Sequence, residues 1–201
     1  MSESTNAKKS DGIGSMIKLG LILAAFSIGA CTVLALVNNV TAPVIDANNN
    51  SKAKAAMKEI FPSADDFESA KEKCGTTASG VTTLDSMYYA KSGSDIIGAV
   101  VQISGPTYDR STIIVGMDND GIVTGMRYLE NNDTKSFGQN GSDPDYKVKS
   151  GDTFYGQFAG KNSADGFVAG ETFDAITGAT ITSNGIATMM NDACTAMGEC
   201  L

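Results

Sequence analysis

The segment Asp174–Gly185, DAITGATITSNG, carries the strongest clue to the fold and function of this 201-residue chain. It contains no His or Cys, and its only charge is on Asp174. It therefore offers neither a transition-metal site nor a general base that works near neutral pH. Its other notable residues are small or carry a hydroxyl group: Thr177, Gly178, Ala179, Thr180, Thr182 and Ser183.

This cluster is expected at the start of a closing helix. Apolar residues at helical spacing predict a helix from Asn184 to about Met197. Thr182 or Ser183 is a natural N-cap, and the free backbone N–H groups of a helix start suit a phosphate. From these residues alone, a ligand site and an ordinary hydroxyl-capped turn with nothing bound both stay open. The apolar positions are Ile186, Met189, Met190, Ala193 and Met197.

Upstream of the cluster, short apolar or alternating segments predict strands. Asp118-Asn119-Asp120-Gly121 is a turn signature between two of them, so we expect a hairpin there. Phe154–Phe158 is expected as a short helix. The expected fold is α+β, with a twisted, mainly antiparallel sheet flanked by helices. The predicted strands are Ser86–Lys91, Ile96–Ser104, Ser111–Met117, Ile122–Leu129 and Gly166–Ala169.

The same turn could suggest calcium, but an EF-hand loop ending there would need an acid at position 116 and a glutamate at 127. Those positions hold Gly116 and Arg127. We therefore interpret the tetrad as a plain turn. The polar segment Asn131–Lys149 follows the hairpin, and loops this long in a compact domain are often functional.

Composition excludes several kinds of chemistry. The chain has no His, which removes Ser-His triads, most zinc hydrolases and imidazole acid–base catalysis. After residue 18 it has 12 Lys and Arg against 21 Asp and Glu. This acidic balance disfavours nucleic-acid binding, which needs a basic face.

The N-terminal part predicts a membrane anchor. Leu19–Val37 has no charge, and nineteen helical residues span about 28 Å, close to the thickness of a bilayer core. Positive residues precede it, and the next basic residue is Lys52, so the positive-inside rule places the N-terminus in the cytoplasm. We expect a cytoplasmic segment 1–18, a transmembrane helix 19–41, a connector with an amphipathic helix 42–80, and an extracytoplasmic domain 81–201.

Two other interpretations of this anchor stay open. Ile28-Gly29-Ala30-Cys31 resembles a lipoprotein processing site, and a cleaved signal peptide would have an apolar region of about 7–15 residues. Against both, the apolar run continues past Cys31. An uncleaved anchor in the lipid bilayer is therefore the preferred interpretation.

The segment Asn38–Asn50 is expected to be a short polar connector, with Pro43 ending the membrane helix. Residues 51–61 predict a short amphipathic helix ended by Pro62, and residues 62–80 a surface loop. The apolar face of the amphipathic helix is Ala53, Ala56, Met57 and Ile60.

The cluster fits the pattern D-x-x-[ST]-G-A-[ST]-x-x-[ST] and in this way resembles proteins that carry FMN on a threonine through a phosphoester bond. The wider chain resembles the G subunits of Rnf ion-translocating electron-transport complexes. The resemblance includes one membrane helix, the connector Thr41-Ala42-Pro43-Val44-Ile45, and the hairpin GMDNDGIVTGMRYLE followed by NNDTKSFG. It covers most of residues 16–195.

This resemblance implies that Thr180 is the FMN attachment point, with the rest of the cluster serving the ligand or the attaching enzyme. It also implies that the loop after the hairpin approaches the flavin ring. There the chain departs from the family pattern, because Lys135-Ser136-Phe137-Gly138 replaces Pro-Gly-Leu-Gly, and Phe137 would lie against the ring or simply pack. The implied contacts are Asp133, Thr134, Phe137, Gly138, Asp174, Thr177, Gly178, Ala179, Thr182 and Ser183.

The resemblance further implies a magnesium-dependent flavin transferase that uses FAD and releases AMP. It implies electron relay through FMN beside the other Rnf subunits, which exchange electrons between ferredoxin and NAD while Na⁺ or H⁺ crosses the membrane. We find no Gly-rich dinucleotide fingerprint, which agrees with a subunit that binds no nicotinamide itself.

Three rivals stay open. The C subunit of the Na⁺-translocating NADH:quinone oxidoreductase shares the modification pattern but is typically longer. A free-standing membrane flavoprotein reductase has the same domain type. An anchored binding module without a cofactor would use the TGAT segment only as a cap.

The exterior cysteines Cys74, Cys194 and Cys200 lack C-x-x-C spacing and make a poor metal or iron–sulfur site. One disulfide or three free thiols are both compatible with the sequence.

Overall fold

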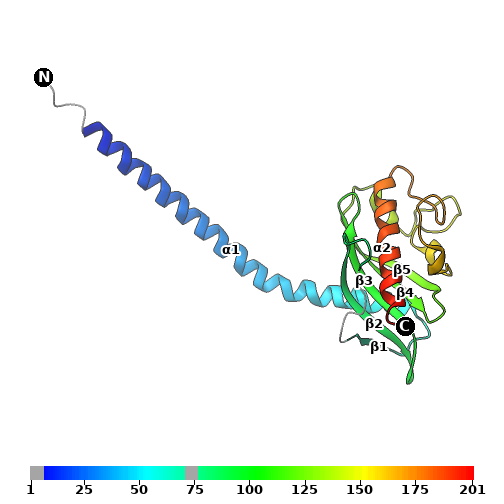
Figure 1. The fold of residues 1–201 in the computed structure, drawn as a ribbon. Coiled ribbons are helices and arrows are strands. Elements are labelled where there is room, and N and C mark those ends of the chain that lie inside the picture. Colours follow the sequence, from blue (N-terminus) through cyan, green and yellow to red (C-terminus); the bar gives the residue numbers. More distant parts are fainter. Residues whose placement is uncertain (1–6, 71–76) are drawn as a thin grey trace. The chain divides into compact units, whose positions relative to one another are not determined.

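The computed structural model describes residues 7–70 and 77–201 of the chain (Figure 1). By internal contacts they form two compact units, Met1–Asn49 and Asn50–Leu201. Within the described residues, the first unit is helical, and the second contains a five-stranded sheet with a long helix and several short 3-10 turns.

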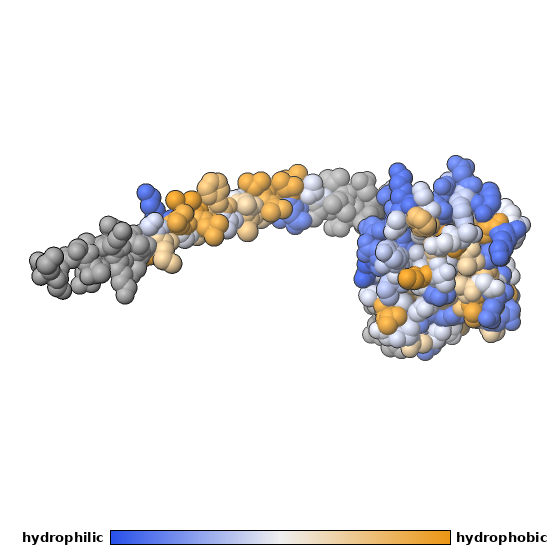
Figure 2. Space-filling model, turned by 90° about the horizontal axis from the view of Figure 1, so that it is seen from above, coloured by the Kyte–Doolittle hydropathy of each residue, from blue (hydrophilic) through white to orange (hydrophobic). Residues whose placement is uncertain are grey.

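Helix α1 runs from Ala7 to Ile60. Its segment Gly14–Thr41 has a mean hydropathy of 2.4 and is exposed throughout, which makes it long and apolar enough to cross a membrane. Orange, apolar residues make up most of this segment in Figure 2, with a few polar residues such as Lys18 among them.

The prediction that Pro43 ends the membrane helix is wrong, because the helical assignment continues through it. A proline removes one backbone hydrogen bond inside a helix and commonly kinks it, but a long helix can continue on both sides. Residues 51–60 are helical as predicted, and the predicted apolar positions of that segment are all buried: Ala53, Ala56, Met57 and Ile60.

The sheet has the order β1-β2-β3-β4-β5, and each neighbouring pair is antiparallel. Four of the predicted strands are confirmed with slightly longer bounds, and Gly121 closes the β4–β5 turn with a φ of +78°. The strands are β1 Asp66–Ser69, β2 Thr83–Ser92, β3 Asp95–Pro106, β4 Arg110–Asp118 and β5 Val123–Asn131.

Two strand predictions need correction. β1 lies in the segment that we expected to be a loop, and its polar sequence Asp-Phe-Glu-Ser gives no strand signal. Gly166–Ala169 is not a strand, since only an isolated bridge joins Ala169 to Phe173. Gly166 and Gly170 both have positive φ, so the segment between them is too short and too sharply bent to pair.

The two faces of the sheet bury different sets of residues, as the alternation of a strand requires. On β3, Ala99, Val101 and Ile103 join the core beneath the C-terminal helix, while Val100 joins a smaller core with Met57 at the end of α1. The sheet is therefore flanked by helical residues on both faces, which confirms the α+β prediction.

Helix α2 runs from Thr180 to Gly198 and lies along one face of the sheet (Figure 1). Its predicted apolar face is confirmed, since every one of those positions is buried: Ile186, Met189, Met190, Ala193 and Met197. The helix begins four residues earlier than predicted.

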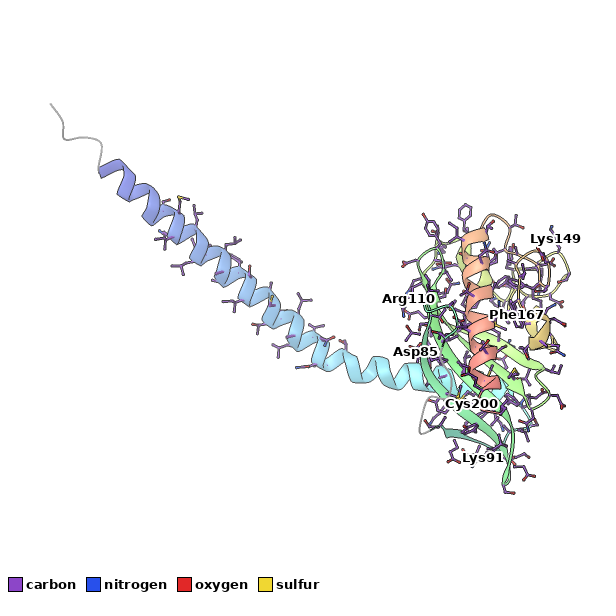
Figure 3. All side chains as sticks on the ribbon, viewed as in Figure 1. Asp85, Lys91, Arg110, Lys149, Phe167 and Cys200 are labelled. Carbon is purple, nitrogen blue, oxygen red and sulfur yellow. The ribbon has the colours of Figure 1, made fainter. Side chains whose placement is uncertain are left out.

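Short 3-10 turns fold the segment between β5 and α2: η1 Gly138–Ser142, η2 Gly156–Phe158 and η3 Ser163–Asp165. The expected helix at 154–158 is thus a single 3-10 turn. Phe154, Phe158 and Phe173 pack ring against ring with centroids 4.9–6.0 Å apart. Phe167, labelled beside α2 in Figure 3, completes this aromatic group.

Candidate functional site

A cleft of about 420 Å³ opens at the start of α2. Three segments that are distant in sequence form its walls: the β3–β4 turn, the loop after β5, and the start of α2. The residues that line it are Tyr108, Thr134, Phe137, Gly138, Gly178, Ala179, Thr180, Ile181 and Thr182.

The start of α2 lines this cleft. Ala179 is the N-cap residue, and no side chain caps the helix. The expectation that Thr182 or Ser183 caps it is therefore wrong. The first turn of any helix leaves N–H groups without an intrahelical partner, and the helix dipole adds positive potential there. Because Thr180, Ile181 and Thr182 line the cleft, this potential falls within it.

The four hydroxyl groups of the cluster have different surroundings. Thr180 is exposed and lines the cleft, whereas Thr177 is exposed but does not line it. Thr182 and Ser183 are buried. The Ser183 hydroxyl accepts a hydrogen bond from Ile176 N at 2.9 Å and donates one to the carbonyl of Ala179 at 3.0 Å. Thr180 is thus the cluster's one hydroxyl that is both accessible and inside the cleft.

Asp133 lies behind the cleft, where it joins the three walls. Its carboxylate accepts hydrogen bonds from the Thr107 hydroxyl at 2.5 Å, Asp109 N at 2.8 Å and the Thr182 hydroxyl at 2.5 Å. Burial alone would raise the pKa of Asp133. The hydrogen bonds outweigh that effect and hold its pKa below the usual range. Asp133 was expected to contact a cofactor, but the structure places it beneath the lining residues.

The loop after β5 presents Phe137 through a tight turn. Phe137 N donates to the carbonyl of Thr134 at 3.2 Å, and Ser136 between them has a φ of 65°. A positive φ at the third residue of such a turn is the mark of a type II turn, where glycine is preferred. The Phe137 side chain is 53% exposed. The turn therefore holds an apolar ring at the cleft.

Glycines allow the walls to approach each other. A Cβ on Gly138 would lie 2.4 Å from Asp133 Oδ2 and 2.5 Å from Thr182 Oγ1, so no larger residue fits. A Cβ on Gly185 would lie 2.4 Å from the carbonyl oxygen of Pro106. The loop and the β3–β4 turn both pack directly on α2 at these two positions.

Asp174 and Thr177 lie outside the lining of the cleft. Asp174 Oδ2 accepts from Ser150 N at 2.7 Å, and Asp174 N donates to the Gln157 side chain at 2.7 Å. Thr177 N donates to the Tyr146 hydroxyl at 3.1 Å. These bonds fix the backbone that leads into the cleft.

Sequence reasoning missed Thr107, Tyr108 and Ile181. Ile181 was inside the pattern but was not singled out. Thr107 and Tyr108 lie in a turn between two predicted strands, and only long-range packing brings that turn to α2. Nothing in their sequence indicates more than a turn position.

Of the cysteines, Cys74 lies outside the described residues. Cys194 is buried on α2, and this burial raises the pKa of its thiol to about 12. It is therefore a neutral packing residue rather than a nucleophile.

The fold and the cleft define the class of protein, and comparison with known families agrees. Residues 107–195 match the model of the FMN-binding domain, which spans all three walls of the cleft. Residues 6–60 match the RnfG N-terminal region. The chain is thus a flavoprotein with an FMN-binding domain behind an apolar N-terminal helix.

Similar proteins place it in one family. The chain is 30% identical over 193 residues to the G subunit of the Na⁺-translocating ferredoxin:NAD⁺ oxidoreductase complex of Acetobacterium woodii, with 88% of each chain covered. It is 26% identical over 188 residues to the G subunit of the ion-translocating oxidoreductase complex of Yersinia pestis, covering 89% of this chain and 88% of the relative. The chain belongs to the family of Rnf complex G subunits. It is therefore a redox subunit of a multi-subunit Rnf oxidoreductase complex, with an N-terminal helix suited to a membrane anchor.

The cleft residues fit FMN. Backbone donors and the helix dipole suit a phosphate group. A Cβ on Gly178, whose φ is +77°, would lie 3.5 Å from the Phe137 ring, so the Gly178 backbone and that ring lie close together. The cleft volume is within the range of about 300–1,000 Å³ found for small-molecule sites.

Proposed function

We propose that this chain carries FMN through a phosphoester bond to Thr180 and relays electrons within an Rnf complex. The observation that carries the proposal is the position of the Thr180 hydroxyl. It is exposed, lies in the cleft, and belongs to the first turn of α2, where backbone N–H groups favour a phosphate. Thr182 and Ser183 are buried and already hydrogen-bonded, so neither competes.

The attachment needs a separate enzyme, because a threonine hydroxyl is a poor nucleophile. The co-reactant is FAD, bound by a magnesium-dependent transferase. The Thr180 oxygen forms a bond to the phosphorus of the FMN half, the pyrophosphate P–O bond breaks, and AMP leaves. The hydroxyl proton goes to a base on the transferase.

Once bound, the flavin supplies one- and two-electron chemistry, while the protein supplies position and potential. The chain's own residues hold the phosphate end at the start of α2 and place Phe137 and the other loop residues beside the ring. The electron partners are other Rnf subunits. The relative from A. woodii is named for ferredoxin and NAD⁺, and these are the proposed end partners of the complex.

The test is to co-express the full chain with a flavin transferase and measure intact mass and in-gel flavin fluorescence. The wild type should gain the mass of FMN minus water and fluoresce after denaturation, whereas Thr180→Ala should do neither. Thr195→Ala, which removes an exposed hydroxyl of α2 outside the cleft and outside the pattern, is the matched control and should load normally.

A fluorescent Thr180→Ala chain would disprove the attachment site. A wild type that never gains flavin beside an active transferase would instead support an anchored module without covalent cofactor. Co-purification with multi-span membrane subunits would distinguish a member of a complex from a free-standing flavoprotein.

A further inference from the structure

The turn between β3 and β4 carries an exposed aromatic ring that the family pattern does not single out. Tyr108 is 67% exposed, yet its side chain lines the cleft. Single exposed apolar residues are ordinary on protein surfaces and need no explanation. Tyr108, however, is not a single exposed apolar residue, because others line the same cleft.

The exposed large apolar residues of the domain gather at the cleft. Among the described residues after 60, seven such side chains are exposed, and three of them line the cleft, including both aromatic ones. The other exposed ones in the domain are dispersed in sequence. The three at the cleft are Tyr108, Phe137 and Ile181.

Hydrogen bonds and packing hold the residues on both sides of Tyr108 in place, whereas the Tyr108 ring is exposed. The Thr107 hydroxyl and the Asp109 N–H both donate to the buried carboxylate of Asp133. The carbonyl oxygen of Pro106 packs directly on Gly185 of α2. An exposed ring on a fixed backbone loses little entropy when a ligand covers it, which is the physical meaning of a pre-organised contact.

We propose that Tyr108 is a flavin-contacting residue that covers the isoalloxazine ring from the β3–β4 turn. The inference rests on the proposed FMN site. The ring of Tyr108 supplies apolar contact area, as aromatic residues do in ligand sites. Its phenol also supplies a specific signature. A phenol in contact with a flavin quenches light emission by lending one electron to the excited ring and taking it back, with no net oxidation.

The experiment compares flavin emission from native and denatured full-length protein carrying FMN. Denatured emission reports how much flavin is attached, and native emission reports what touches the ring. Tyr108→Phe keeps the apolar contact but removes the electron-donating phenol, so its native emission should rise severalfold at equal denatured emission. Tyr108→Trp restores an electron-rich ring and should bring the emission back down.

Two further measurements keep the result specific. Tyr88→Phe removes a phenol that lines a different surface cavity, and its native emission should match the wild type. Tyr108→Leu should also make the flavin more accessible to iodide, a collisional quencher, because it removes the covering ring.

Equal native emission from the wild type and Tyr108→Phe, at equal denatured emission, would overturn the assignment of Tyr108 while leaving the FMN site intact. Denatured wild type without flavin emission or added mass would overturn the proposed function itself. Loss of flavin from Tyr108→Phe alone, with Tyr108→Trp fully loaded, would support the contact as one needed for loading.

Discussion

At position 136 the chain holds a serine in a backbone conformation that glycine adopts more easily. The φ of 65° at Ser136 is the one positive value among the described residues other than glycine. A left-handed conformation costs an L-residue roughly 1–2 kcal/mol. The family pattern has Pro-Gly where this chain has Lys135-Ser136, and Pro-Gly is the best sequence for a type II turn. The chain therefore stores strain in the loop that presents Phe137.

Ser136→Gly should raise the free energy of unfolding by up to about 1 kcal/mol, because relief of the strained φ exceeds the added flexibility of the unfolded chain. Lys135→Gly adds the same flexibility without relieving strain and is the matched control. Thermal unfolding of the full-length protein in detergent measures both. Equal stabilities for the two variants would contradict a strained turn.

At the scale of elements, one carboxylate holds a turn, a loop and a helix together. Asp133 accepts from Thr107, Asp109 and Thr182, which belong to the β3–β4 turn and to α2. Because its folded pKa lies below the ordinary value of about 3.9, its contribution to stability is fully present above that pH. The contribution is lost as the pH falls through the folded pKa.

Asp133→Asn should therefore lower the free energy of unfolding near neutral pH by about 1–3 kcal/mol, since an amide cannot accept all of these donors. The difference from the wild type should begin to shrink below about pH 4, where the carboxylate of the unfolded chain becomes protonated. It should disappear as the pH falls through the lower pKa of the folded state. Denaturant unfolding at several pH values measures this. Asp109→Asn, an exposed aspartate in the same turn, should follow the wild type. A difference for Asp133→Asn that is independent of pH would contradict the assignment.

The elements also show what the sequence could predict and what it could not. β3, β4 and β5 were predictable because β-branched runs flank a clear turn, and Met189 and Met190 sit at helical spacing. The start of α2 could not be predicted. The sequence favours Thr182 as a helix cap, but its hydroxyl donates to Asp133, a partner 49 positions away. Tyr108 lies at the cleft because long-range packing brings the β3–β4 turn to the start of α2. A single sequence does not reveal such packing.

The whole molecule combines an apolar helix with a cleft-bearing domain, and its orientation is a prediction. Positive residues precede the apolar segment Gly14–Thr41, and Lys52 is the first basic residue after it. The positive-inside rule then places the N-terminus in the cytoplasm and the FMN-binding domain outside. A covalent bond suits that side, because lost FMN could not be resupplied there.

Fusions to the C-terminus test this orientation. Alkaline phosphatase, which needs an extracytoplasmic location, should be active when fused after Leu201, whereas the same fusion to a chain lacking residues 1–41 should be inactive. Phosphatase activity that is independent of the N-terminal helix, or absent from the full-length fusion, would contradict it.

Asp133 bonds to Thr107, which precedes it in the sequence, and to Thr182, which follows it. This arrangement sets the order in which the walls of the cleft come together during synthesis. The partners of Asp133 leave the ribosome far apart in time, because Thr107 is 26 positions before Asp133 and Thr182 is 49 positions after it. Contacts of such wide sequence separation form late, after the strands have paired. A nascent polypeptide therefore exposes Thr180, the proposed attachment point, before Asp133 has joined the walls of the cleft.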